Sequence, residues 1–248
     1  MQRLDGRTER DMRPVEIQTG VNMYAEGSAL IKVGHTHVIC TASVEEKVPP
    51  FLRDTLQGWV TSEYGMIPRA TDQRTQREAT RGKASGRTQE IQRLIGRSLR
   101  SVMDLKALGS RTIWIDCDVI QADGGTRTAS ITGAFVAMVL ALSKLKSLNR
   151  LTGPPLRGMV AATSVGLLGG VPFLDLSYAE DSQADVDMNV VRTDTGRYVE
   201  VQGTGEKTPF TPEEMKAMLE LANHGANLLF EHQRKTLREV LPTLLPRP

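Results

Sequence analysis

The segment from residue 128 to residue 148 places the strongest constraint on how this chain can fold. It is predicted to be a helix, and its apolar residues occupy all sides of that helix rather than one stripe: Ile131, Ala134, Phe135, Met138, Val139 and Leu142. A helix that is apolar all round has to be buried on all sides. The uninterrupted apolar stretch is too short to cross a bilayer, since Thr132 and Gly133 break it. We therefore predict a central core helix and no membrane segment.

The other elements follow from the hydrophobic periodicity. Apolar and β-branched residues alternate, as in strands, over residues 15–19, 27–33, 36–44, 58–64, 112–122, 159–168 and 197–202. Helical spacing of apolar residues marks residues 87–105, 128–148 and 212–237. This order lacks the regular alternation of a doubly wound fold. It predicts an α/β (α+β) protein with mixed sheets packed against helices, a single domain over residues 1–238, and a disordered tail over residues 239–248.

Composition narrows the class of protein further. With 248 residues and a net charge of +2, the chain is an ordinary globular protein. Cys40 and Cys117 each lie in an apolar run without metal-binding or redox spacing, so a reducing, cytoplasmic location is expected. The positive charge is concentrated between Arg69 and Arg100, where nine basic residues face three acidic ones. Such a local basic field can bind anions although the whole chain is nearly neutral.

The most acidic stretch, residues 172–191, is predicted to form a hairpin. Asp181 lies in its turn, and Asp185 and Asp187, two residues apart, project from the same face of the following strand. Carboxylate oxygens of this kind suit Mg²⁺ or Mn²⁺, which complete their coordination with water or substrate phosphate. A solvated acidic hairpin without function is the alternative interpretation.

Two arginines occupy the first turns of predicted helices, where the helix dipole disfavours a positive charge. Arg87 begins one helix, and Arg127 follows the glycines of Gly124-Gly-Thr-Arg127 at the corner that leads into the central helix. A shared anion between the two helix starts would explain both positions, because arginine and free backbone N–H groups suit phosphate. The alternative is that one or both arginines pair with a nearby acid such as Asp123.

Together these features indicate phosphoryl transfer. A phosphate held by Arg87 and the corner 125–127, beside a metal held by Asp181 and Asp187, provides the positioning and charge neutralisation that this reaction needs. No serine triad or reactive cysteine is evident.

These same residues carry a resemblance to the bacterial ribonuclease PH family, which is itself similar to polynucleotide phosphorylase and to the ring subunits of the exosome. The matching segments are RLDGR (3–7), KVPPFLR (47–53), GWVTSEYGM (58–66), GRTQEIQRLIGR (86–97), CDVIQADGGTR (117–127) and EDSQADVDMN (180–189). The resemblance extends to about residue 238. It implies a phosphate-dependent 3′→5′ exoribonuclease, a nucleotidyltransferase that trims tRNA precursors and releases nucleoside diphosphates reversibly.

The resemblance also implies the roles of particular residues. Inorganic phosphate, the co-substrate, is held by Arg87, Gly125, Thr126 and Arg127. The metal-linked catalytic carboxylates are Asp181 and Asp187, with Asp185 close by, and the metal is Mg²⁺ or Mn²⁺. The basic loop with Arg69, Arg74, Arg77 and Arg81 contacts the RNA. The family further implies a homohexamer built as a trimer of dimers.

Two other functions compete with this one. A metal-dependent hydrolytic nuclease would use water in place of phosphate, but it has no need of a second phosphate site with two arginines. A catalytically silent RNA-binding ring subunit would lack an acidic residue of the site or the corner arginine, and both are present here.

Overall fold

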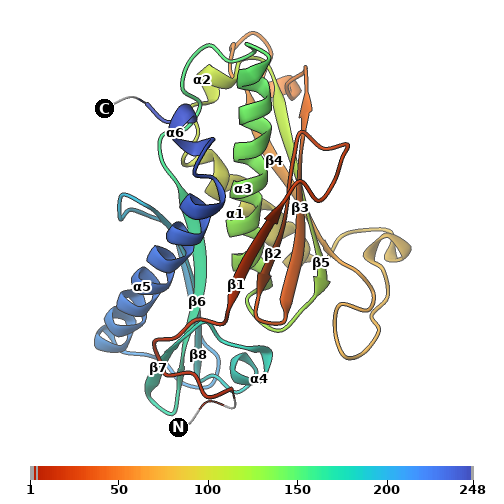
Figure 1. Cartoon of the computed structure of the whole chain (residues 1–248). Helices are drawn as coiled ribbons and strands as arrows, with labels where there is room; N and C mark the ends of the chain where they lie inside the picture. The colour runs from red at the N-terminus through yellow and green to blue at the C-terminus, as the bar shows by residue number, and fades with distance from the viewer. Residues whose placement is uncertain (1–2, 4, 247–248) are drawn as a thin grey trace.

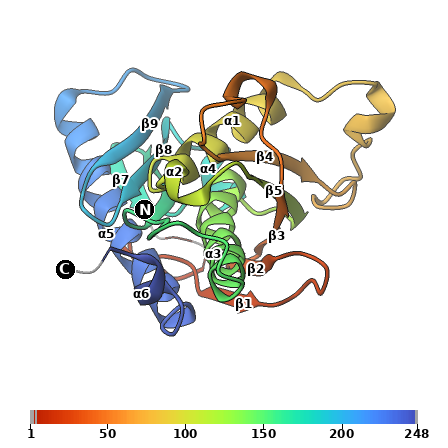
Figure 2. The same ribbon diagram turned by 90° about the horizontal axis from the view of Figure 1, so that it is seen from above.

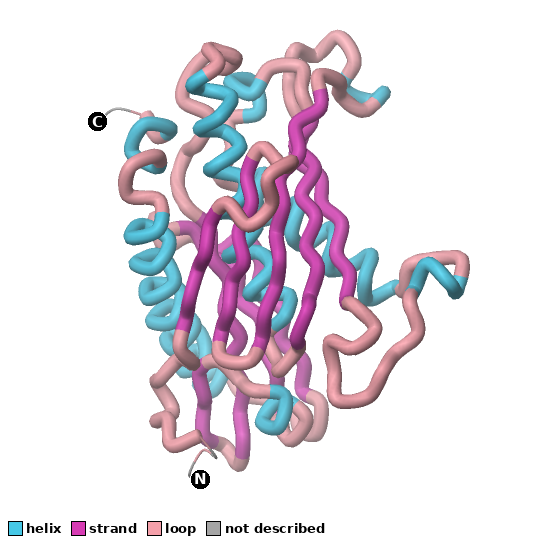
Figure 3. Tube along the Cα trace, turned by 45° about the vertical axis from the view of Figure 1, so that its right-hand side comes forward, coloured by secondary structure: helices cyan, strands magenta, loops and turns pink. Residues whose placement is uncertain are grey.

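The computed structural model describes residues 3 and 5–246, and all side chains among them except those of residues 79 and 81. Its first sheet has five strands in the order β1-β2-β3-β5-β4 (Figures 1 and 3). The strands are β1 (Val15–Thr19), β2 (Gly27–Val33), β3 (Thr36–Glu45), β4 (Trp59–Met66) and β5 (Thr112–Gln121). All neighbours pair antiparallel except β4, which lies parallel to β5 at the edge.

The second sheet has four antiparallel strands in the order β7-β6-β8-β9. They are β6 (Val160–Leu168), β7 (Val171–Leu174), β8 (Val186–Thr193) and β9 (Tyr198–Gly205). Every residue of β6 is buried, because helices cover both faces of this strand. The predicted α+β class, with mixed sheets packed against helices, is confirmed.

The predicted core helix is α3 (Thr126–Ser147), and it lies between the two sheets (Figures 1 and 2). It packs against β2 and β3 on one side and β6 on the other. Sixteen of its residues are buried, which explains why apolar residues occupy all its sides. Among the described residues it is the one helix long and apolar enough to cross a membrane, but 83% of the apolar window is buried inside the protein. Burial of this extent is typical of a core helix.

Two further long helices complete the layers. Helix α1 (Gly86–Arg100) packs on β4 and α3, and α5 (Pro212–Thr236) packs on β6, β7 and β1. Short elements lie between them: η1 (Pro50–Leu52), η2 (Glu78–Arg81), α2 (Leu105–Leu108), α4 (Tyr178–Asp181) and α6 (Leu241–Leu244). The amide of Gln233 on α5 donates to Thr132 O and Val160 O, 3.1 Å each, and so joins α5 to α3 and β6 inside the core.

The structure corrects two predictions. Residues 172–191 do not form a hairpin: β7 and β8 both pair with β6, and α4 connects them. The predicted disordered tail is wrong for α6, in which Leu241 and Leu244 are buried at 5% and 0% exposure. Pro242 lies in the first turn of α6, where proline is compatible with a helix. Residues 247–248 of that tail lie outside the described part of the chain.

A buried ion pair fixes the segment before β1 to the second sheet. The Arg13 guanidinium donates to both carboxylate oxygens of Asp175, at 2.9 and 2.7 Å, and the Arg13 backbone N–H donates to the same carboxylate at 2.8 Å. Both side chains are about 95% buried, at 4% and 5% exposure. Asp175 has a positive φ of 54°, a strained conformation for a residue other than glycine. The neighbouring bidentate pair of Arg3 with Glu180 ties the same segment to α4.

We expect Arg13→Met to lower the free energy of unfolding by about 3–5 kcal/mol, because buried Asp175 would lose its bidentate partner and keep only the backbone N–H at position 13 and the 3.4 Å contact with Arg7. Lys32→Met is the matched control: it removes the exposed pair with Glu16 on the first sheet and should cost less than about 1 kcal/mol. Urea unfolding followed by circular dichroism measures both. Equal stability of the two variants would show that the buried pair does not hold the fold.

Candidate active site

The corner that leads into α3 requires two glycines. Gly124 and Gly125 have φ values of 74° and 64°, in the left-handed region that glycine adopts without strain. A Cβ atom on Gly124 would lie 2.5 Å from Leu176 O. The corner therefore lies directly against the segment that enters α4.

Hydrogen bonds hold this contact in place. Tyr178 N donates to the Asp123 carboxylate at 3.1 Å, and the Thr36 hydroxyl donates to Gly124 O at 2.6 Å. Arg13, already fixed by Asp175, also donates to Asp123 O. The start of α3 on one side and the start of α4 on the other are thus joined through the same few residues. As a result, Asp181 at the end of α4 lies close to the arginine at the start of α3.

Asp181 and Asp187 interact with each other and with the two predicted phosphate-binding arginines. Burial raises the pKa of Asp187, and the negative charges of Asp181 and Glu206 raise it further, while Arg127 opposes the shift. Asp181 is exposed as a whole residue, yet partial burial of its carboxyl group raises its pKa; Arg87 and Arg127 act against this shift. Two carboxylates and two guanidinium groups from α4, β8, α1 and α3 therefore share one site.

The two arginines differ in how firmly they are held. Arg87 is exposed in the first turn of α1 and makes no hydrogen bond or ion pair within the described part of the chain. Arg127 has a side chain that is 15% exposed, and it contacts Glu90 at 3.4 Å and Gln202 at 3.1 Å. Arg127 does pair with an acid, then, but with Glu90 rather than Asp123, which lies against Arg13.

Thr126, the residue before Arg127, anchors the corner to β4. Thr126 is buried at 7% exposure and forms a hydrogen bond of 2.9 Å with the Tyr64 hydroxyl. Burial raises the pKa of Tyr64, although the charges of Arg87 and Arg127 act against this. The neutral phenol of Tyr64 is therefore a buried hydrogen-bond partner of Thr126, close to the charges of both arginines.

Asp185 takes a different position from the other two aspartates. Its carboxylate accepts a hydrogen bond of 2.8 Å from Gly169 N in the turn between β6 and β7. Its backbone carbonyl accepts from Lys207 N at 3.1 Å. These contacts give Asp185 a role in holding the strands that carry Asp187, while a catalytic role for it stays a prediction.

Sequence reasoning missed four residues of this site: Tyr64, Glu90, Gln202 and Glu206. Glu90 could have been found from helical spacing, since it lies three residues after Arg87 on α1. Gln202 and Glu206, on and just after β9, are distant from all the motifs in the chain. Only the pairing of β9 with β8 brings them near Asp187.

The basic residues of the segment 67–85 project from the molecule as a loop between β4 and α1, coloured tan in Figure 1. Arg69, Arg74 and Arg77 are exposed on it. Arg81 lies in η2, and its side chain is outside the described part of the structure. Both ends of the loop are anchored: Ala122 N donates to Ala70 O at 2.8 Å, and the Thr88 hydroxyl donates to Glu78 at 2.8 Å. The loop thus leads directly to Arg87.

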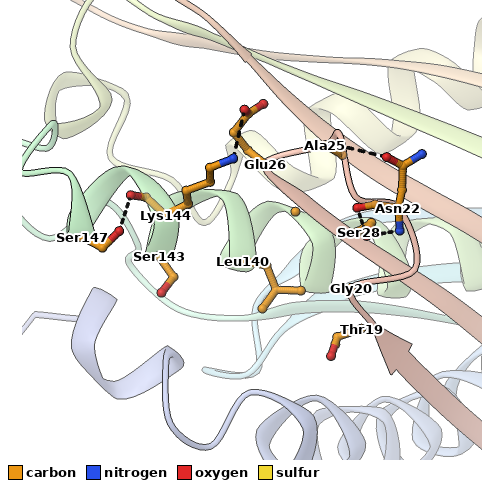
Figure 4. A pocket seen from close by; sticks show the side chains of 11 residues that line it. Thr19, Gly20, Asn22, Ala25, Glu26, Ser28, Leu140, Ser143, Lys144 and Ser147 are labelled. Atoms are coloured by element: carbon orange, nitrogen blue, oxygen red, sulfur yellow. Dashed lines mark hydrogen bonds and ion pairs between the residues drawn. The ribbon is translucent and has the colours of Figure 1, made fainter.

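A separate hollow of about 460 Å³ lies between the β1–β2 loop and the other end of α3 (Figure 4). Lys144 there pairs with Glu26 at 3.4 Å, and Ser28 bonds to Asn22. Lys144 is 18 residues after Thr126, or about 27 Å along the helix at 1.5 Å per residue. This hollow is therefore not part of the site formed by the arginines and aspartates.

Comparison with known proteins shows the family of this chain. Residues 11–144 match the 3′ exoribonuclease family, domain 1, and residues 158–225 match its domain 2. The first match covers the five-stranded sheet and most of α3, and the second covers the four-stranded sheet and the first half of α5. The chain belongs to the 3′ exoribonuclease family. The prediction that residues 1–238 form a single domain stays a prediction.

Within this family the chain is similar to proteins named ribonuclease PH. It is 61% identical to the one from Solibacter usitatus (strain Ellin6076) over 235 residues, which are 95% of this chain and 99% of that protein. It is 59% identical to the one from Bacillus cytotoxicus over 241 residues, 96% and 98% of the two chains. The predicted activity is confirmed: the chain is an enzyme of the ribonuclease PH type, a phosphorolytic 3′→5′ exoribonuclease whose co-substrate is inorganic phosphate and whose substrate is RNA.

Solved structures share the fold. Rice Rrp46 aligns with a TM-score of 0.77 at 19% identity, over 95% of this chain and 100% of that one. A subunit of the Archaeoglobus fulgidus exosome with RNA bound to the active site aligns with a TM-score of 0.77 at 22% identity, over 93% and 92% of the chains. At this level of identity the likeness supports the fold.

Removing one carboxylate from the site should stabilise the protein at neutral pH. The raised pKa of Asp181 and of Asp187 means that the folded state favours the protonated form, so stability is lost as pH rises above the ordinary value of 3.8. Asp181→Asn and Asp187→Asn avoid that loss. We expect both to raise the thermal midpoint at pH 7 in metal-free buffer, and the gain to shrink as the pH falls toward 4.

Asp104→Asn is a control for which we expect the opposite change in the thermal midpoint. Hydrogen bonds from the backbone N–H of Ala107 and from Arg157 lower the pKa of Asp104, so its ionised form contributes stability at pH 7 that disappears in acid. This variant should lower the thermal midpoint at pH 7. A destabilising effect of Asp181→Asn and Asp187→Asn at pH 7 would mean that burial and the neighbouring charges do not raise the pKa of these two groups in the folded protein.

Proposed function

We propose that this chain removes nucleotides from RNA 3′ ends by using a phosphate that is bound between the first turns of α1 and α3. The observation that carries the proposal is the placement of Arg87 and Arg127 beside the aspartates, since both arginines act to lower the pKa of Asp181 and Arg127 acts to lower that of Asp187. The backbone N–H groups of residues 125–127, together with the α3 dipole, favour an anion at the same point. Arginines next to carboxylates provide both a phosphate site and a cation site.

The carboxylates fit Mg²⁺ or Mn²⁺. Among the described residues, no group of three or more His, Cys, Asp or Glu is placed to hold a metal ion alone. Asp181 and Asp187 provide two oxygen donors that repel each other, and phosphate oxygens of the substrate can supply others, which is the ligand set that Mg²⁺ commonly takes. When bound, the ion would stabilise negative charge on the reacting phosphate.

The proposed reaction forms one phosphorus–oxygen bond and breaks another. An oxygen of inorganic phosphate attacks the phosphorus of the last phosphodiester, and the bond from that phosphorus to the 3′ oxygen of the preceding nucleotide breaks. The terminal nucleotide leaves as a nucleoside 5′-diphosphate, and the shortened RNA takes a proton on its new 3′ hydroxyl. Arg87 and Arg127 position the attacking phosphate and neutralise charge, which is the main requirement of phosphoryl transfer.

The substrates that best suit this site are tRNA precursors with extra 3′ nucleotides. Arg69, Arg74, Arg77 and Arg81 belong to a projecting loop that leads to Arg87, and a loop of this charge can hold the body of a folded RNA while its 3′ end enters the site. The similarity to exosome subunits supports an oligomer. We infer a homohexamer, a trimer of dimers, that works in the cytoplasm.

The first test measures nucleotide release from a tRNA with a few extra 3′ residues, with Mg²⁺, in the presence and absence of inorganic phosphate. We expect nucleoside diphosphates, and only when phosphate is present. Arg87→Ala should raise the apparent KM for phosphate by about tenfold or more, because a charged donor to the anion is lost, and should leave the Kd for RNA within about twofold. Phosphate-independent release of monophosphates would indicate hydrolysis, and no release would indicate a silent RNA-binding subunit. An unchanged KM for phosphate would exclude Arg87 from the site.

A second test concerns the basic loop. Replacing Arg69, Arg74 and Arg77 together by Ala should weaken tRNA binding and reduce the slope of log Kd against log salt by about 2–3, because each phosphate contact adds close to one unit of slope. Activity on a short single-stranded oligonucleotide should stay within about twofold. Equal losses on tRNA and on the oligonucleotide would show that these arginines serve the catalytic end instead.

A further inference from the structure

The side chain of Gln202 on β9 lies in the middle of a polar cluster that includes Arg127. Its amide oxygen accepts a hydrogen bond of 3.1 Å from Arg127. Its amide nitrogen donates to Glu90 at 3.0 Å and to Glu200 at 2.9 Å. Glu200 in turn pairs with Arg97 on α1. The cluster thus connects α1, the start of α3 and β9 around one guanidinium group.

The orientation of the Gln202 amide follows from its neighbours. Ionised Glu90 and Glu200 can only accept hydrogen bonds, and an arginine can only donate them. The amide nitrogen has to face the two carboxylates, which leaves the amide oxygen for Arg127. A flipped amide would place donor against donor and acceptor against acceptor. Gln202 is therefore held in the one orientation in which it can hold Arg127.

The hydrogen bond to Gln202 limits the rotation of the Arg127 side chain, which is one of the two predicted phosphate ligands. An arginine side chain has several rotatable bonds, and ordering it costs up to about 2 kcal/mol. Arg87 is exposed and makes no such contact among the described residues, so Arg127 is the more fixed of the two predicted phosphate ligands. A donor that is already oriented binds its ligand without that loss of freedom.

We propose that Gln202 is a positioning residue for phosphate: it orients Arg127 toward the anion, and Glu90 and Glu200 orient Gln202. The proposal rests on the proposed role of Arg127 in binding phosphate. Gln202 acts through Arg127 and is not itself a phosphate ligand. Loss of its amide should therefore weaken the binding of phosphate while leaving the chemical step and the binding of RNA in place.

The test compares Gln202→Met with wild type in the phosphate-dependent release assay. Methionine keeps the length of the side chain but cannot accept the hydrogen bond from Arg127. We expect the KM for phosphate to rise about five- to tenfold, in line with loss of a hydrogen bond to a charged group, with kcat at saturating phosphate and KM for RNA within about twofold. A purely structural role would lower the thermal midpoint and leave the KM for phosphate unchanged, which would overturn the proposal.

Gln18→Met is the matched control. Gln18 on β1 also donates to a glutamate two residues earlier on its strand, Glu16, at 2.6 Å, and it lies in the first sheet away from Arg127. This variant should leave the KM for phosphate unchanged. A rise equal to that of Gln202→Met would show that the effect does not depend on the contact with Arg127.

Two further variants separate this proposal from the role of Arg127 itself. In an Arg127→Ala background, Gln202→Met should cause no further rise in the KM for phosphate, because its partner is gone. If Arg127→Ala alone leaves the KM for phosphate unchanged, the proposed phosphate site fails and the positioning role fails with it. If Arg127→Ala raises the KM and Gln202→Met does not, only the positioning role is overturned.

The exchange of Glu90 and Gln202 provides a rescue. Gln202→Glu alone places three carboxylates together, whereas Gln202→Glu combined with Glu90→Gln leaves one amide and two carboxylates, the same numbers as in the wild-type cluster. In the double variant, Glu at 202 accepts from Arg127, and the amide at 90 donates to it. We expect the double variant to have a KM for phosphate within about threefold of wild type and the Gln202→Glu variant to fold less stably. A double variant as impaired as Gln202→Met would contradict the proposal.

Discussion

The buried pair of Arg13 and Asp175 is the interaction on which the site depends. Arg13 comes from the segment before β1, and Asp175 follows β7 at the edge of the other sheet. The same guanidinium also contacts Asp123 at the corner that opens α3. One side chain therefore fixes the distance between the start of α3, which carries Arg127, and the segment into α4, which carries Asp181. Two buried charges far from water tolerate little displacement, because each is costly when unpaired.

The candidate site contains neighbouring carboxylates whose negative charges repel one another. Burial raises the pKa of Asp181 and of Asp187, Glu206 adds to both shifts and Asp181 adds to that of Asp187, which means that ionising the two aspartates costs stability. Arg87 and Arg127 offset part of that cost. Such a site favours a ligand that brings both an anion for the arginines and a cation for the carboxylates. A phosphate with a bound divalent ion has this composition, so its binding at the proposed site would offset the repulsion among these carboxylates.

The groups of the candidate site come from α1, α3, α4 and β8, and this explains why parts of the site could be predicted from the sequence and others could not. Arg87, Gly125 and Arg127 were predicted as site residues because they break local rules: a positive charge in the first turn of a helix and paired glycines at a corner are visible in the sequence alone. Asp181 and Asp187 were predicted from their acidic stretch, although that stretch is not the predicted hairpin. The strand order β7-β6-β8-β9 places β6 between β7 and β8. The alternation of apolar and polar residues marks β6, β7 and β8 as strands but does not show which of them pair.

Gln202 and Arg13 show what local patterns leave out. Gln202 lies in a strand with alternating polar residues, and any neutral polar residue at this position would give the same sequence pattern. Its contacts with Arg127 and Glu90 join residues that are 75 and 112 positions apart. Arg13 lies in a charged segment without periodicity. Neither residue departs from a local rule, so neither can be found before the sheets are assembled.

The sequence by itself determined the core helix, most of the strands and the class of fold, because these depend on periodicity, on helix starts and on residue types that act locally. The tertiary structure alone decided which strands pair, that the end of the chain packs as α6, and which side chains contact the predicted site residues. The physical reason is that buried ion pairs and hydrogen bonds between distant residues form only when two sheets close around α3. Their partners are chosen by that closure and not by position along the chain.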